Sequence, residues 1–166
     1  MTDAAPLDPE RIIKVLAKHR VRFVLIGALA ARLQGFPRLT ADVDITPARD
    51  AENLVNLAAA LQELDARIFT EAVPQGLPFD CNPQMLARVE MLNLVTSAGR
   101  IDVAFVPSGT EGYDDLVQSA VRFEVYGLEL KVASLEDIAR SKEAAGRSQD
   151  LQDVLVIREM LRRKDS

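Results

Sequence analysis

The run IGALAARLQGFPRLTADVDI occupies residues 26–45. It leaves an apolar run, turns at Gly27, continues through a segment rich in Ala and Leu, and ends in Asp42 and Asp44. In a strand, residues i and i+2 point to the same face, so these two carboxylates project together while their apolar neighbours face the core. Two adjacent carboxylates repel each other unless a cation or a proton lies between them. The pair is therefore either structural or part of a metal site.

A third aspartate, Asp102, also stands alone in an apolar run, RIDVAF at residues 100–105. Mg²⁺ is typically bound by one or two carboxylates together with substrate phosphates. A two-metal phosphoryl-transfer site, with ions about 3.5–4 Å apart, would require three such strand-borne aspartates. Taken alone, an Asp-x-Asp pair is more often a turn feature, and Asp102 could simply pair with Arg100. The combination favours a metal site.

The turn ahead of the aspartates offers a place for phosphate. Gly27 lies between a predicted strand and a predicted helix, where free backbone N–H groups and the positive end of the helix attract anions. Arg38 and Thr40 could add a guanidinium fork and a hydroxyl to the same anion.

Hydrophobic periodicity predicts alternating helices and strands along the chain. The predicted helices cover residues 9–19, 28–34, 50–64, 111–119, 135–145 and 148–160, and the predicted strands cover 22–26, 41–46, 89–96, 101–106 and a pair within 123–132. Residues 97–100 are expected to join two of these strands as a hairpin, and residues 72–83, with three prolines and a glycine, to form a loop. This order indicates an α+β (mixed α/β) domain, with a core over residues 1–132 and a helical segment over 133–166 packed on it.

Polar residues mark several helix starts. Asp8 is a good N-cap ahead of the first helix, and Ser134 opens a capping box for the helix at 135–145. Ser148 can cap the last helix. Asp150 and Asp153 are expected in the first turn of that helix, where acidic side chains favour the helix dipole.

The composition excludes several classes of protein. The chain has 166 residues, 48% of them hydrophobic and 27% charged, with a net charge of −5. This balance does not indicate a broad electrostatic surface for nucleic acid. The single cysteine excludes an internal disulfide framework and is typical of a reducing compartment. Without a secretory-signal pattern or an apolar run near the roughly 20 residues that span a bilayer, we expect a cytoplasmic protein that does not enter membranes.

These motifs resemble the DNA polymerase β-like nucleotidyltransferases and, within that superfamily, the small bacterial AbiEii-type proteins, many of which are toxins of toxin–antitoxin pairs. The resemblance rests on residues 26–45, extends to Arg100-Ile101-Asp102-Val103 and to SKEAAGRSQD at residues 141–150, and so covers most of the chain. It implies a polymerase-β-like core sheet flanked by helices. Asp42 and Asp44 would bind Mg²⁺, with two ions expected and Mn²⁺ as an alternative. Asp102 would share the metal or accept the proton of the attacking hydroxyl.

The resemblance also implies a nucleotide site. Gly27 and the N–H of Ala28 would hold the triphosphate, while Lys142 and Arg147 would neutralise phosphate charge. Without the resemblance, these two cations would be interpreted as solvated surface charges. Ala28 departs from the family pattern, which usually has Gly or Ser there, because alanine supplies no hydroxyl and its Cβ narrows the approach of a phosphate.

The implied activity is a Mg²⁺-dependent transfer of a nucleoside monophosphate from an NTP to an acceptor hydroxyl. Three acceptors remain open. An RNA end, notably of tRNA, fits a toxin with an antitoxin partner. The other two are a protein side-chain hydroxyl and a small molecule such as an antibiotic. The alternative is a degenerate nucleotidyltransferase domain that binds nucleotide or a partner protein. Ala28 favours this alternative, and the three aspartates oppose it.

Overall fold

A computed structural model describes residues 5–165 of the chain. In chain order its elements are α1 (Pro9–Lys18), β1 (Phe23–Ile26), α2 (Gly27–Leu33), β2 (Asp42–Pro47), α3 (Ala51–Glu63), β3 (Arg67–Ile68), α4 (Pro83–Leu86), β4 (Met91–Thr96), β5 (Gly99–Ala104), α5 (Tyr113–Leu116), the 3₁₀ turn η1 (Val117–Ser119), β6 (Val121–Val125), β7 (Leu128–Val132), α6 (Leu135–Ala145) and α7 (Ser148–Lys164).

The strands form one mixed sheet in the order β3-β4-β5-β2-β1-β7-β6. At its centre β2 runs antiparallel to β1 and parallel to β5, while β1 is parallel to β7. The hairpins β4–β5 and β6–β7 extend the sheet on either side of this centre. Since β2 and β5 are far apart in the sequence, their pairing is a tertiary feature that unites the first and second halves of the chain.

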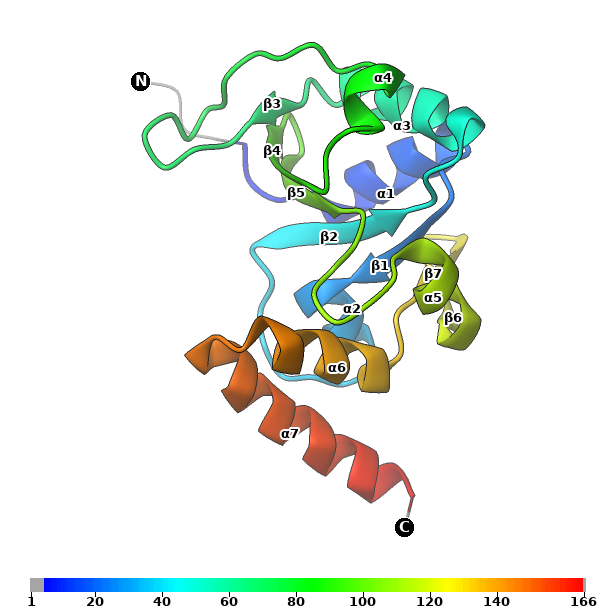
Figure 1. Cartoon of the computed structure of the whole chain (residues 1–166), viewed down its shortest axis with the longest axis vertical. Coiled ribbons are helices and arrows are strands. Elements are labelled where there is room, and N and C mark those ends of the chain that lie inside the picture. The colour runs from blue at the N-terminus through cyan, green and yellow to red at the C-terminus, as the bar shows by residue number, and fades with distance from the viewer. Residues whose placement is uncertain (1–4, 166) are drawn as a thin grey trace.

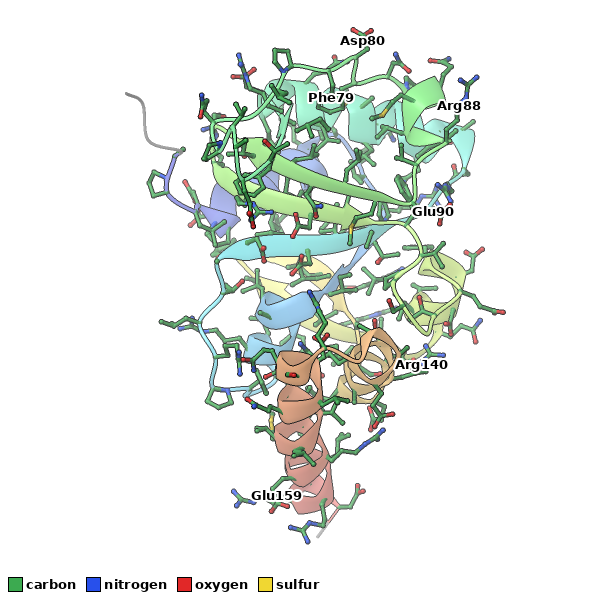
Figure 2. All side chains as sticks on the ribbon, turned by 60° about the vertical axis from the view of Figure 1, so that its left-hand side comes forward. Phe79, Asp80, Arg88, Glu90, Arg140 and Glu159 are labelled. Carbon is green, nitrogen blue, oxygen red and sulfur yellow. The ribbon has the colours of Figure 1, made fainter. Side chains whose placement is uncertain are left out.

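Helices cover both sides of the central strands. In Figure 1, α1 and α3 lie on one side of β1 and β2, and α2 and α6 lie on the other, with α7 extending away from α6. Figure 2 shows the resulting elongated shape, with Phe79 and Asp80 at one end and Glu159 of α7 at the other. One hydrophobic core includes side chains from the sheet, α1, α3, α6 and α7. This architecture confirms the predicted α+β class.

Local polar contacts explain where several helices begin and end. The Asp8 carboxylate accepts the Arg11 backbone N–H at 3.1 Å, and the Ser134 hydroxyl accepts the Asp137 N–H at 3.1 Å, as the capping patterns predict. Gly146 ends α6 in a left-handed conformation with φ +71°.

The start of α7 differs from the prediction. Ser148 is the first helical residue rather than the cap, and the Asp150 carboxylate accepts the backbone N–H of Arg147 at 3.3 Å. Asp153 was expected in the first turn and instead lies one turn further along, with its side chain buried against α6. The prediction of a capping role is therefore wrong for Ser148 and Asp153.

The remaining differences concern short elements and boundaries. β3 has two residues and α4 has four, and neither has enough length to show a hydrophobic period in the sequence. The β4–β5 turn is confined to residues 97–98, and α7 continues to Lys164. The boundary between a core at 1–132 and a helical segment at 133–166 stays a prediction.

Among the described residues, no helix combines the length and the apolar character required to cross a membrane.

Candidate active site

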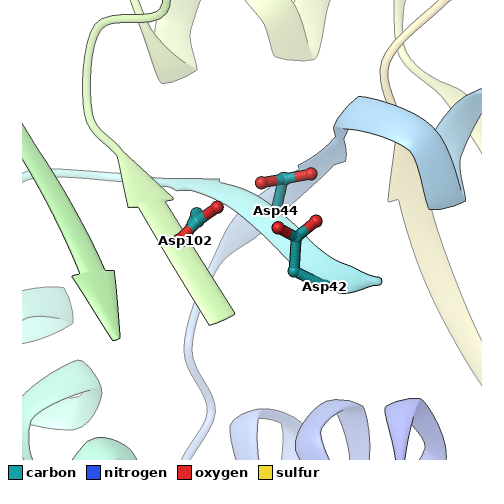
Figure 3. A group of neighbouring side chains, drawn as sticks. All are labelled: Asp42, Asp44 and Asp102. Carbon is teal, nitrogen blue, oxygen red and sulfur yellow. The ribbon is translucent and has the colours of Figure 1, made fainter. Parts of the chain in front are cut away.

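Three carboxylates meet on one face of the sheet. Asp42 and Asp44 alternate with buried residues along β2, and the parallel β2–β5 register places Asp44 directly opposite Asp102. One oxygen of each carboxylate lies within 4.8 Å of an oxygen of the other two. Figure 3 shows the three side chains rising from two neighbouring strands toward the same space. Among residues 5–165, this is the one group of three or more acidic, His or Cys side chains close enough to share a metal ion.

The electrostatics of this group favour a bound cation. Burial, followed by repulsion from Asp42 and Asp102, raises the pKa of Asp44 to about 8. Burial and repulsion from Asp42 also raise the pKa of Asp102 to about 6, although Arg100, with Nη2 3.3 Å from Oδ1, opposes that shift. A divalent cation would supply the positive charge that these carboxylates lack. The all-oxygen donor set suits a hard ion such as Mg²⁺.

Gly27 is required where the chain passes over Asp44. Its φ is +72°, and a Cβ at this position would lie 2.1 Å from Asp44 Oδ2. Ile26, at the N-cap of α2, has no side-chain acceptor for the first N–H groups of the helix. The first residues of α2 therefore lie beside the three carboxylates. No side chain caps the N–H groups at this helix start.

The carboxylates open into a cleft of about 390 Å³ between the sheet, the segment after β5, and α6. Polar and charged side chains from these parts, from the α6–α7 turn and from the start of α7 line it, namely Asp42, Asp44, Asp102, Ser108, Thr110, Asp137, Ser141, Lys142, Arg147 and Asp150. Gly27 and Ala28 line it as well. The structure thus brings together the three aspartates, the glycine turn and both cations of the 141–150 motif.

The two cations of the cleft are held by acidic partners on α7. Lys142 Nζ lies 2.9 Å from Asp153 Oδ2 and 3.6 Å from Asp150 Oδ1, and Arg147 Nε donates to Asp150 at 2.7 Å. Burial alone would raise the pKa of Asp150, but the hydrogen bond from Arg147 and the charges of Arg147 and Lys142 hold it below its usual value. These acids and bases form a charged network at the α6–α7 turn.

Arg38 and Thr40 do not line the cleft. Arg38 Nη2 lies 2.6 Å from Asp153 Oδ1, and the Thr40 hydroxyl donates to the carbonyl oxygen of Asp42 at 2.5 Å. Their contact with nucleotide stays a prediction. Sequence reasoning missed Ser108, Thr110 and Asp137 as lining residues, because they come from a loop and a helix whose position over β5 is set by the tertiary fold.

The family comparison agrees with this geometry. A family model described as a nucleotidyltransferase of unknown function, DUF6036, matches residues 10–162. The chain belongs to this nucleotidyltransferase family. No curated protein matches it in sequence.

Solved structures share the fold at low sequence identity. The lincosamide antibiotic adenylyltransferase LnuA, solved with lincomycin bound, aligns with a TM-score of 0.58 and 12% identity over 92% of this chain and 98% of its own. The antibiotic-resistance factor ANT(2″)-Ia aligns with a TM-score of 0.52 and 16% identity, over 91% of this chain and 80% of its own. The nucleotidyltransferase resemblance is thereby confirmed for the fold, and the AbiEii-type assignment stays a prediction.

Proposed function

We propose that this DUF6036 protein is a Mg²⁺-dependent nucleotidyltransferase that moves a nucleoside monophosphate from an NTP to an acceptor hydroxyl. The observation that carries the proposal is the meeting of three carboxylates within 4.8 Å at the floor of a cleft. The same cleft is lined by a helix start and two cations, which are suited to a polyphosphate.

Asp42, Asp44 and Asp102 are the residues that would hold the metal, with two Mg²⁺ ions as the leading candidate and Mn²⁺ as the alternative. The repulsion of Asp44 and Asp102 by Asp42, together with the raised pKa values of Asp44 and Asp102, supports a site that is completed by cations. When bound, the ions would neutralise phosphate charge and stabilise the attacking and leaving oxygens of the transfer.

The residues of the chain would position the reactants. The N–H groups of Gly27 and Ala28 would hold the triphosphate, and Lys142 and Arg147 would offset its negative charge. In the transfer, a bond forms between the acceptor oxygen and the α-phosphorus, the bond from that phosphorus to the β-phosphate oxygen breaks, and pyrophosphate leaves. A carboxylate oxygen of Asp102 would accept the hydroxyl proton of the acceptor.

A small-molecule hydroxyl is the acceptor that we favour. The lincomycin-bound adenylyltransferase of similar fold supports this choice. The net charge of −5 argues against a broad RNA-binding surface. A tRNA or other RNA end, with a toxin role and an antitoxin partner, and a protein hydroxyl are the competing acceptors.

A second candidate function is nucleotide binding without transfer. Ala28 supports it, because this residue lines the cleft at the position where the resemblance to polymerase-β-like nucleotidyltransferases implies Gly or Ser. Both candidates require metal-dependent NTP binding. Only the first requires transfer of the nucleoside monophosphate, so a transfer assay separates them.

Calorimetric titration of each of the four NTPs, with MgCl₂ or MnCl₂ and again with EDTA, tests the binding step. Absence of metal-dependent binding would refute both candidates.

NTPs labelled at the α-phosphate, incubated with pools of small molecules, RNA and protein, then report transfer and its acceptor. We expect Asp44→Asn to lower transfer by at least about 100-fold, a loss of the size seen for preorganised charge stabilisation, and the exposed-site control Glu111→Gln to leave it unchanged. Full transfer by Asp44→Asn would show that the metal site is misassigned, and binding without transfer would favour the second candidate.

A further inference from the structure

The Asp153 carboxylate is buried between α6 and α7 and does not line the cleft itself. It contacts two segments that lie next to the cleft. Asp153 is 3% exposed, and its oxygens lie 2.9 Å from Lys142 Nζ, 2.9 Å from Gln149 Nε2 and 2.6 Å from Arg38 Nη2. Lys142 belongs to α6 and reaches the cleft. Arg38 belongs to the segment between α2 and β2, which leads to Asp42.

Stability alone does not account for a charged group at this place. Removing a carboxylate from water is costly, and buried ion pairs can often be replaced by packed apolar side chains without loss of stability. The neighbouring positions Val154 and Ile157 already supply apolar packing for α7. An apolar residue at position 153 could not hold the side chains of Arg38 and Lys142 in fixed positions.

The contact with Lys142 fixes a long side chain that is otherwise flexible. A lysine ammonium group has three N–H donors. Asp153 accepts one of them, and Asp150 lies 3.6 Å from the same nitrogen. The Lys142 side chain is 20% exposed and lines the cleft, so an N–H remains for a ligand there. Side chains that are ordered before binding lose less entropy when a ligand arrives.

The contact with Arg38 acts on the other side of the site. The aromatic ring of Phe36, which is buried, lies 5.8 Å from the Arg38 guanidinium carbon. Asp153 thus anchors the segment that enters β2 just before the candidate metal-binding carboxylates, and it does so from the same buried position that holds Lys142.

We propose that Asp153 is a positioning residue for nucleotide binding, which sets Lys142 against the polyphosphate and fixes the Arg38 segment ahead of the carboxylates. This role rests on the proposed nucleotidyltransferase function. It also replaces the capping role that the sequence suggested for Asp153.

The test is the affinity of the full chain for MgCl₂ with the NTP that wild type binds most tightly, measured by calorimetry. Asp153→Asn keeps the size of the side chain and removes its charge, and we expect it to weaken binding by about tenfold or more. Glu143→Gln is the matched control. It breaks the Arg158–Glu143 ion pair, which also joins α6 to α7 at 2.9 Å but lies away from the cleft, and should change affinity by less than about twofold.

A double-mutant cycle separates positioning from a general loss of structure. Lys142→Met alone should also weaken binding, and adding Asp153→Asn to it should cost less than about threefold more, because the two residues act together. Lys142→Arg keeps the charge but not the placement that Asp153 provides, and should lose about fivefold or more. This last variant tests positioning even if Asp153→Asn does not fold, which circular dichroism would reveal.

Each result has a defined meaning. Wild-type affinity in Asp153→Asn or in Lys142→Arg would overturn the positioning role, as would full additivity in the cycle. Tighter binding in Asp153→Asn would also overturn it, because it would show that Asp153 competes with phosphate for Lys142. If wild type binds no NTP, the proposed function fails and the positioning role fails with it. If wild type binds and only the variants disagree, the failure is confined to Asp153.

Discussion

Gly27 is tightly constrained by its close approach to the carboxylates. A Cβ there would lie 2.1 Å from Asp44 Oδ2, and the backbone has a φ of +72°. We expect Gly27→Ala to lower the free energy of unfolding by about 2–4 kcal/mol, combining backbone strain with a clash that cannot relax freely. Urea unfolding measures this change. Gly127→Ala is the control, since its φ is +76° but nothing lies within 4 Å of an added Cβ. Equal losses in both variants would contradict the close approach to Asp44.

Asp44 is expected to destabilise the metal-free protein. Burial first, then repulsion from Asp42 and Asp102, raises its pKa from 3.8 to about 8. Between about pH 4 and 8 the folded state therefore holds a proton that the unfolded state has released, so stability falls as pH rises through this window. In EDTA, the melting temperature should decrease from pH 5 to pH 8.

Asp44→Asn should remove much of that decrease and melt higher than wild type at pH 8, by about 2–4 °C for each kcal/mol gained. Differential scanning calorimetry provides the measurement, with Glu111→Gln as the exposed control that keeps the wild-type slope. A wild-type melting temperature that rises from pH 5 to pH 8 in EDTA, with Asp44→Asn following it, would contradict the raised pKa.

Among the helices and strands, the sequence predicts long segments well and short ones poorly. The helices α1, α3 and α6 follow their periodicity and caps closely. By contrast, Arg67–Ile68 becomes a strand only because it pairs with β4, and α4 is a single turn capped by Asn82. Elements of two to four residues have no period of their own, so tertiary pairing decides them.

The orientation of α7 gives an element-scale prediction. Its sequence contains the run VLVI at residues 154–157, which does not reveal the buried face. In the structure Ile157 is 0% exposed and Leu155 is 72% exposed. Ile157→Ala should therefore lower the free energy of unfolding by about 2–5 kcal/mol, and Leu155→Ala should change it by no more than about 0.5 kcal/mol. Chemical denaturation of both variants tests the orientation, and a larger loss for Leu155→Ala would show that α7 is rotated.

The candidate site depends on strand and helix pairings that local sequence patterns do not reveal. The spacing of Asp42 and Asp44 predicts that they share one face of a strand. Asp102 lies beside them only because β5 pairs in parallel with β2. In the same way, the pairing of Lys142 with Asp153 depends on the crossing of α6 and α7. Residue types and local spacing identified the aspartates, whereas the partners of Lys142 and Arg38 follow only from the folded chain.

Metal binding should couple the stability of the whole chain to pH. Protons and a divalent cation compete for the same carboxylates, so metal affinity should increase as pH rises through the pKa values of Asp102 and Asp44, about 6 and about 8. A cation at about 100 times its dissociation constant stabilises the folded state by about 2.7 kcal/mol, which corresponds to a rise of about 5–10 °C in melting temperature. We expect 10 mM MgCl₂ or MnCl₂ to raise the melting temperature more at pH 8 than at pH 6, and Asp42→Asn to lose most of this rise at both. A rise of the same size at both pH values, retained in Asp42→Asn, would place the bound cation away from the three carboxylates.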